Sequence, residues 1–136
     1  MNKTFKHKDF NLVVYVEDTD FQGFVYHANY LKYFERSRTE FLLDNNIQQN
    51  ILLQQEKAFV VRSIKMKYSS PAKIEDKVII KSEIYKNSNA RLTFFHKALD
   101  KTSSNILCTA DVEICLINLT TKKPQIFNND LLLLFS

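Results

Sequence analysis

Glycine is almost missing from this chain of 136 residues, in which Gly23 is the only one. Globular proteins contain about 7% glycine on average. The dinucleotide-binding fingerprint and the phosphate-binding Walker A loop each need several glycines at fixed spacing. The sequence therefore excludes both of these nucleotide-binding motifs.

Cysteine is scarce as well. Cys108 and Cys115 are the only two, and they lie seven positions apart without a Cys-x-x-Cys motif. No histidine stands close enough to complete a zinc site with them, and the three histidines, His7, His27 and His96, are too dispersed to form a site of their own. We expect a buried, reduced cysteine pair and no metal.

Long apolar runs are missing too. No stretch approaches the ~18 apolar residues of a membrane-spanning helix. Residues 1–9 are polar and charged, unlike a targeting segment with a basic start and an apolar core. We therefore expect a cytoplasmic protein without a transmembrane segment.

The charge balance is mildly basic. The chain has 19 Lys and Arg against 15 Asp and Glu, a net charge of +4. This excess suits a polyanionic small molecule, but it is weak evidence for nucleic acid, because no nucleic-acid motif or clustered basic stripe accompanies it. With 45% hydrophobic and 25% charged residues, the composition is that of one globular domain, which we place at residues 1–136.

Hydrophobic periodicity predicts a strand, a long helix and then four more strands. Residues 10–16 alternate, residues 28–45 repeat with a helical period, and residues 47–57 suit a short second helix. From residue 60 onward the period is two, most clearly over residues 106–116. Short connections favour antiparallel neighbours, and the apolar helix face must lie against the sheet. We predict an α+β fold with a five-stranded antiparallel sheet and a central helix.

Three expectations concern the faces of these elements. Arg38 falls inside the apolar arc of the helix, which includes Leu31, so we expect it to be partly buried and paired with Glu35. His96 lies on the apolar face of a strand, where a structural role is expected. The strand after the helices is expected to present four side chains on one face: Val60, Ile64, Met66 and Tyr68.

The loop between the first strand and the helix holds the densest group of polar residues beside a helix start. It contains Glu17, Asp18 and Asp20, and His27 stands where the helix begins. The first amides of a helix lack internal partners and favour an anion or a developing oxyanion. A carboxylate beside them is suited to attack an acyl carbonyl or to activate water. On spacing alone, the commoner role of such acids is to form turns.

Several segments together form a recognisable pattern: residues 14–20 (Val-Tyr-Val-Glu-Asp-Thr-Asp), Gly23, residues 25–31 (Val-Tyr-His-Ala-Asn-Tyr-Leu), residues 34–38 (Phe-Glu-Arg-Ser-Arg), residues 68–72 (Tyr-Ser-Ser-Pro-Ala), Asp76 and residues 111–124. This pattern resembles hotdog-fold acyl-CoA thioesterases of the 4-hydroxybenzoyl-CoA thioesterase family, and most of all their YbgC-like, Tol–Pal-associated branch. The resemblance covers nearly the whole chain. It implies a hotdog fold and hydrolysis of an acyl-CoA to a free acid and CoA.

The resemblance implies a role for each matched residue of the loop. Asp20 matches the catalytic aspartate, which acts as nucleophile or general base. His27 matches a histidine that positions or polarises the thioester, and its backbone amide matches the oxyanion donor. Asp18 matches a companion acid that usually lacks that role, and Gly23 matches a glycine that lets the loop bend close to the substrate. No cofactor is implied, since coenzyme A is part of the substrate.

One position departs from the branch. Its members often carry a tyrosine where this chain has Val16, so that only Tyr15 of a Tyr-Tyr pair remains. If the missing hydroxyl assists catalysis, this protein does without it or uses another group.

Further residues are candidate substrate contacts. Gly23 and four others are expected along the acyl or pantetheine channel, although the last three suit a core equally well: Tyr26, Phe59, Val60 and Tyr68. Four cationic side chains suit the phosphates of CoA, although such residues more often simply form a solvated surface: Lys65, Lys67, Lys73 and Arg91.

Alternative functions remain open at this point. A thioesterase acting on acyl carrier protein, or a hydratase, is compatible with the same fold, although the loop from Asp20 to His27 favours hydrolysis. The change at Val16 gives some weight to a non-catalytic acyl-CoA binding protein. The resemblance also implies a homodimer or homotetramer with active sites at the interfaces between protomers.

Overall fold

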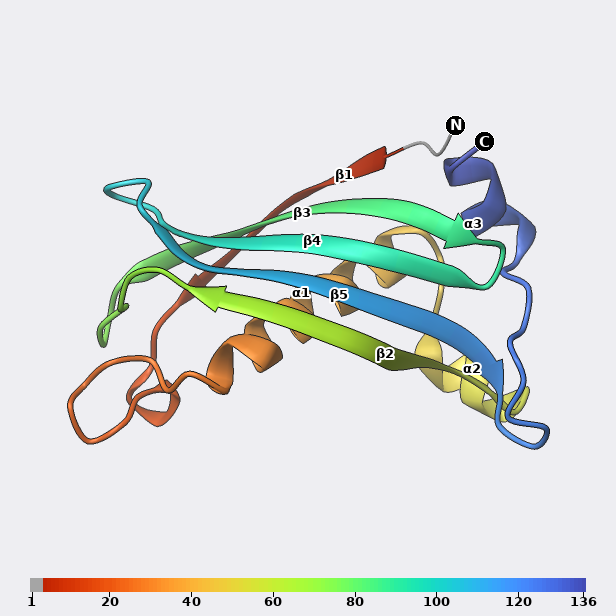
Figure 1. Ribbon diagram of the computed structural model, residues 1–136, viewed down its shortest axis with the longest axis horizontal. Helices are drawn as coiled ribbons and strands as arrows, with labels where there is room; N and C mark the ends of the chain where they lie inside the picture. The colour runs from red at the N-terminus through yellow and green to blue at the C-terminus, as the bar shows by residue number, and fades with distance from the viewer. Residues whose placement is uncertain (1–3) are drawn as a thin grey trace.

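The computed structural model describes residues 4–136, so residues 1–3 of the predicted domain lie outside the described residues. Five strands form one antiparallel sheet in the order β1-β3-β4-β5-β2 (Figure 1). The α+β fold predicted from periodicity is confirmed. The strands are β1 (Thr4–Val13), β2 (Lys57–Tyr68), β3 (Lys77–Ser88), β4 (Arg91–Asp100) and β5 (Ile106–Asn118), and the helices are α1 (Asn29–Asp44), α2 (Gln49–Gln54) and α3 (Asn129–Leu134).

Helix α1 crosses one face of the sheet, and the core lies between the two layers (Figure 1). Burial of one large apolar side chain contributes roughly 1.5–3 kcal/mol, so this interface holds α1 and the segment before it in a fixed position. The largest fully buried side chains come from both layers: Tyr33, Phe34 and Phe41 from α1, and Ile80, Ile84, Leu92, Phe94 and Val112 from the strands.

The predicted helix agrees with α1 to within one residue at each end. Asn46 adopts a left-handed φ of 62° just beyond it, a conformation that asparagine tolerates and that commonly ends helices. The apolar stripe is centred differently from the prediction, because Tyr30 and Tyr33 are buried while Leu31 is exposed at the edge. Tyrosine counts as polar on a hydropathy scale, but its ring is a large apolar surface. The two buried tyrosines therefore shift the buried face of α1 away from Leu31.

The first strand ends earlier than predicted. Strand β1 stops at Val13, and residues 16–18 form a short 3-10 turn instead of continuing the alternation. The carboxylate of Asp18 accepts a hydrogen bond from the Tyr15 backbone N–H at 2.8 Å. This local bond competes with the sheet ladder and curls the chain away from the strand.

A β-bulge in β2 overturns the predicted strand face. Val61 lies opposite Ile114 and Ser63 lies opposite Glu113, so Arg62 is an extra residue without a partner position. A one-residue insertion reverses which side chains point to each face of the sheet.

The consequence is that Val60 does not share a face with the residues that follow the bulge. Val60 lies opposite Cys115, on the outer face of the sheet. Ile64, Met66 and Tyr68 lie opposite core residues of β5 on the face toward α1. The prediction of one shared face for all four residues is wrong, because it assumed an uninterrupted period of two.

His96 lies buried at the centre of the interface between α1 and the sheet. Its ring stacks on Phe34 with centroids 4.9 Å apart, and its Nε2 lies 3.2 Å from the Arg38 guanidinium. Because a guanidinium only donates, Nε2 accepts, and Nδ1 donates to the Ser82 hydroxyl at 2.7 Å. Burial, and then the nearby charges of Arg38 and His7, hold the pKa of His96 well below its usual range.

Arg38 is partly buried as expected, but its hydrogen-bond partner is not the predicted one. Glu35 accepts from the Thr39 hydroxyl at 2.7 Å on the exposed side of the helix, whereas Arg38 donates to His96. Burial lowers the pKa of Arg38, while the charge of Glu35 acts to raise it. The prediction looked for a partner along the helix, and the contact comes from the sheet.

Candidate functional site

The candidate site lies at the N-terminal end of α1. The loop of residues 14–28 reaches this end from β1, and the last residue of β2 arrives at the same end (Figure 1). Isolated bridges tie the loop together at Thr19 and Val25, and tie Phe24 to Lys73 in the connection between β2 and β3. The Val25 N–H also donates to the Ala72 carbonyl at 2.9 Å. The site is therefore built from two stretches that are distant in the sequence, residues 14–30 and residues 68–76.

Asp20 stands at the base of a tight turn within this loop. One of its carboxylate oxygens, Oδ1, accepts from the Gln22 N–H at 2.9 Å and from the Phe24 N–H at 3.4 Å. The other, Oδ2, has no hydrogen-bond partner among residues 4–136. Gly23 completes the turn with a φ of +82°, a conformation that suits glycine. The turn fixes the Asp20 carboxylate and leaves one oxygen available.

Asp18 differs from Asp20 in its surroundings. It is only 5% exposed. Its Oδ2 accepts from the Tyr15 N–H, and its Oδ1 accepts from the Asn29 side-chain amide at 3.0 Å. Both oxygens are therefore used to hold the loop against the start of α1, which suits a structural acid.

His27 and the residue after it supply free backbone amides at the start of α1. Within residues 4–136, no acceptor is found for the N–H groups of His27 and Ala28, whereas the Asn29 N–H donates to the Tyr26 carbonyl at 2.8 Å. The exposed His27 ring lies against the Tyr26 ring, with centroids 4.4 Å apart. Free amides with the partial positive charge of a helix start behind them favour a developing oxyanion.

A cleft of about 330 Å³ opens beside His27. Within it, the Tyr30 hydroxyl is buried without a hydrogen-bond partner among the described residues. Burial raises the pKa of Tyr30 above its usual range, and burial likewise raises the pKa of Tyr68. Both phenols therefore stay neutral and able to donate. The cleft is lined by Val25, His27, Tyr30, Tyr68, Ser69, Ser70 and Pro71.

The structure brings most of the candidate substrate contacts to this end of the molecule. Tyr26 and Tyr68 flank His27, and Lys73 lies opposite Phe24. Lys67 and Lys65 lie on the outer face of β2, opposite residues 109 and 111 of β5. Sequence reasoning gave no role to Tyr30, Ser69 or Ser70, although all three lie within the quoted motifs.

Phe59 and Arg91 lie at the other end of the sheet. Phe59 pairs with Leu116 and Tyr68 pairs with Cys108, so eight positions of β5 separate them, about 27 Å along the strand. Arg91 pairs with Cys115, and its guanidinium bonds Glu113 at 3.3 Å. Within one protomer, Phe59, Val60 and Arg91 are not close to Asp20.

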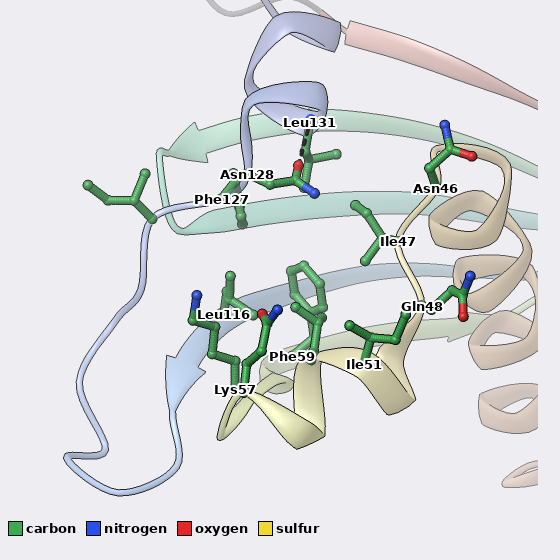
Figure 2. Close-up of a pocket in the computed structure, with 13 residues that line it drawn as sticks. Asn46, Ile47, Gln48, Ile51, Lys57, Phe59, Leu116, Phe127, Asn128 and Leu131 are labelled. Carbon is green, nitrogen blue, oxygen red and sulfur yellow. Dashed lines mark hydrogen bonds between the residues drawn. The ribbon is translucent and has the colours of Figure 1, made fainter.

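Phe59 instead lines a second cavity, of about 380 Å³, at the far end of α1 (Figure 2). Helix α2, the start of β2 and the segment leading into α3 enclose it. Its inner wall is apolar, with Ile47, Leu116, Phe127 and Leu131, and Lys57 stands at its rim. Asn128 closes one side, where its side chain accepts from the Leu131 N–H at 2.9 Å (Figure 2).

Metal-ligating side chains do not gather anywhere in the described part of the chain, where no three of His, Cys, Asp and Glu could hold one ion. Cys108 and Cys115 are free and buried, as expected. Burial raises the pKa of the Cys108 thiol to about 12. None of the helices in residues 4–136 has the length and apolar character to cross a membrane.

Comparison with known proteins agrees with this geometry. The family model of the thioesterase-like superfamily matches residues 14–134. The chain is 38% identical to the acyl-CoA thioesterase YbgC of Haemophilus influenzae over 119 residues, which cover 87% of this chain and 86% of that protein. The chain belongs to the thioesterase-like superfamily.

Solved structures of thioesterases share the fold. A probable thioesterase from Bartonella henselae is 42% identical and superposes with a TM-score of 0.79, covering 89% of this chain and 98% of that one. A 1,4-dihydroxy-2-naphthoyl-CoA thioesterase from Synechocystis has a TM-score of 0.88 at 19% identity, covering 97% and 95%. The second likeness concerns the fold alone. The hotdog fold and the acyl-CoA thioesterase family predicted from the sequence are confirmed, and the roles of single residues stay predictions.

Proposed function

We propose that this protein hydrolyses the thioester of an acyl-CoA to a free carboxylic acid and CoA, with Asp20 and the first amides of α1 as its reacting groups. The observation that carries the proposal is a fixed carboxylate with one free oxygen, on the loop that leads to two unpaired helix-start amides. Membership of the superfamily and the 38% identity to an acyl-CoA thioesterase support the reaction and the substrate class.

In this mechanism the thioester carbonyl oxygen sits at the amides beside His27. Negative charge grows on that oxygen as the carbonyl carbon becomes tetrahedral, and donors already in place stabilise it. The His27 ring, exposed at the same point, positions or polarises the thioester.

Two routes use Asp20. In the first, Oδ2 attacks the carbonyl carbon, CoA leaves as the thiolate, and water then hydrolyses the mixed anhydride and restores the carboxylate. In the second, the carboxylate takes a proton from a water molecule that attacks directly, and passes it to the leaving thiolate. Both routes consume one water and give the same products. The fixed turn around Asp20 serves either route.

The CoA phosphates are proposed to lie near Lys67 and Lys73. Lys73 belongs to the segment that pairs with the loop of Asp20, and Lys67 lies near the same end of β2, on its outer face. Arg91 is already bonded to Glu113 at the far end of the sheet, so it reaches a substrate only from another protomer.

We expect a homodimer or homotetramer. β2 is an edge of the sheet, and an edge strand presents unpaired backbone groups to a partner. Val61 and Ile64 on β2 are 47% and 44% exposed, and Leu31 of α1 is exposed as well. Antiparallel pairing of two β2 edges sets the Phe59 end of one protomer beside the Tyr68 end of the other. Light scattering that finds only a monomer would contradict this part of the proposal.

Free-thiol release from a panel of acyl-CoAs, run in parallel with acyl carrier protein thioesters, tests the function. We expect turnover of acyl-CoAs by the wild type and its loss in Asp20→Asn. Turnover of carrier-protein thioesters alone would show that the substrate is an acyl carrier protein thioester and not an acyl-CoA. Binding of CoA esters without turnover on any chain would contradict the proposal in favour of a binding protein. The cytoplasmic location stays a prediction.

A further inference from the structure

Tyr68 makes a contact that no local sequence pattern predicts. Its hydroxyl donates to the backbone carbonyl of His27 at 2.9 Å, across 41 positions of sequence. Its ring stands edge-on to the His27 ring, with centroids 6.3 Å apart, and 6.0 Å from the Tyr30 ring. The side chain at the end of β2 thus forms a hydrogen bond to the main chain just before α1.

The His27 carbonyl belongs to the peptide that joins His27 to Ala28. A trans peptide is a rigid plane in which the C=O and the N–H point in opposite directions. Holding the His27 carbonyl therefore fixes the direction of the Ala28 N–H. That N–H is one of the helix-start amides without an acceptor in residues 4–136.

The hydrogen bond also changes the strength of this amide. Donation to a carbonyl polarises its peptide group, and the N–H of the same peptide becomes a better donor. Tyr68 stays a neutral phenol at physiological pH, because burial raises its pKa. It borders the cleft through which the thioester would reach these amides.

We propose that Tyr68 is a positioning residue, which holds and polarises the His27–Ala28 peptide so that the Ala28 N–H stabilises the oxyanion together with the His27 N–H. The proposal rests on the hydrolytic function proposed above. Tyr68 acts through the backbone and not by touching the reacting atoms, which separates this role from the channel-lining role expected from the sequence.

The first test is Tyr68→Phe, which keeps the ring and deletes the hydroxyl. Removing a direct oxyanion donor costs roughly 10²–10³ in kcat, so we expect a smaller loss of about tenfold for this indirect contact, with KM within about twofold. Tyr85→Phe is the matched control, because Tyr85 stacks on Phe95 with centroids 5.2 Å apart on the outer face of the sheet. It should leave kcat unchanged.

Two further variants separate positioning from a loss of structure. A 3-fluorotyrosine at position 68 keeps the hydroxyl and makes it a stronger donor, so kcat should equal or exceed that of the wild type. Lactic acid in place of Ala28 turns the His27–Ala28 amide into an ester, which deletes the N–H and keeps the backbone conformation, whereas proline there would force His27 out of its turn conformation. The ester should cost roughly 10²–10³ in kcat, with a thermal unfolding midpoint near that of the wild type.

The outcomes are distinguishable from those that test the proposed function. Wild-type kcat in Tyr68→Phe, or a loss confined to KM, would overturn the positioning role while hydrolysis by Asp20 stands. Wild-type kcat in the folded protein with the ester at position 28 would overturn the assignment of that amide. A wild type that turns over no thioester overturns both proposals.

Discussion

The two ends of α1 each border a cavity of similar volume, about 330 Å³ at the start of the helix and 380 Å³ at its end. Their chemistry differs. At the start, a carboxylate oxygen and two backbone amides lack partners among the described residues. At the far end, the cavity wall is mostly apolar, and the Asn128 cap uses its hydrogen-bonding group on the Leu131 amide.

Cavity size does not mark the groups that we propose for the reaction. The far cavity is the larger one and has more apolar lining, which is the usual mark of a binding site. The groups that we propose for the reaction lie on the loop beside the near cleft, where backbone contacts join residues 14–30 to residues 68–76. Unused hydrogen-bonding capacity at fixed positions is the better indicator here.

Leu131→Ala should have the largest effect on stability. Leu131 is 1% exposed in the wall of the far cavity, and truncating a buried leucine costs about 2–5 kcal/mol of unfolding free energy. We expect kcat for the shortest acyl-CoA that the wild type hydrolyses to stay within about twofold, because this wall is remote from Asp20. Urea unfolding and thiol release check the two parts. Lost turnover at unchanged stability would indicate that the reaction takes place at the far cavity.

Asp18→Ala should have the next largest effect on stability, and it distinguishes the structural acid Asp18 from Asp20 in the same loop. It leaves the Tyr15 N–H and the Asn29 amide, which both donate to Asp18, without their acceptor. Leaving buried groups unpaired costs about 1–3 kcal/mol. Asp20→Asn should leave the unfolding free energy within about 0.5 kcal/mol of the wild type, as is usual for a change outside the core. Equal stability of all three proteins would contradict the division of roles between the two acids.

The smallest effect on stability is expected from His96, a residue of β4 that packs against the middle of α1. The folded state keeps this histidine neutral, since its pKa is held well below the usual range, whereas the unfolded chain binds a proton below about pH 6.5. The unfolded state therefore gains protons as pH falls, and stability should drop by about 1 kcal/mol between pH 7 and 5.5.

His96→Gln serves as the comparison for that pH dependence. Urea unfolding of both proteins at several pH values should give a shallower fall for the variant, whatever its absolute stability. Parallel curves would show that His96 does not contribute.

Much of the fold could be predicted from the sequence because β3, β4 and β5 follow a period of two over most of their length, with register shifts only near strand ends. The errors arose where one residue interrupts a pattern without changing its composition. Arg62 is an inserted position that reverses the faces of β2, and nothing in its residue type marks a bulge. The early end of β1 depends on the Asp18 carboxylate, which the alternation of apolar residues does not record.

The site divides in a similar way. Asp20 and His27 were predicted from a local motif; the structure places His27 just before α1 and Asp20 in the turn of the loop that leads to it, and their roles stay predictions. The contacts of Tyr68 with His27 and of Arg38 with His96 join positions 41 and 58 residues apart. Such pairs depend on how the layers meet, so sequence spacing along one element could not identify them.

Thiol release by three proteins on one acyl-CoA tests most directly whether Asp20 carries out the hydrolysis that we propose. The wild type is compared with Asp20→Asn and with Glu17→Gln, the same chemical change at an exposed acid of the same loop. We predict that Asp20→Asn folds normally and loses about 10²–10⁴ in kcat, the range for a positioned acid or base, while Glu17→Gln stays within twofold. Full activity in a folded Asp20→Asn protein would contradict the account.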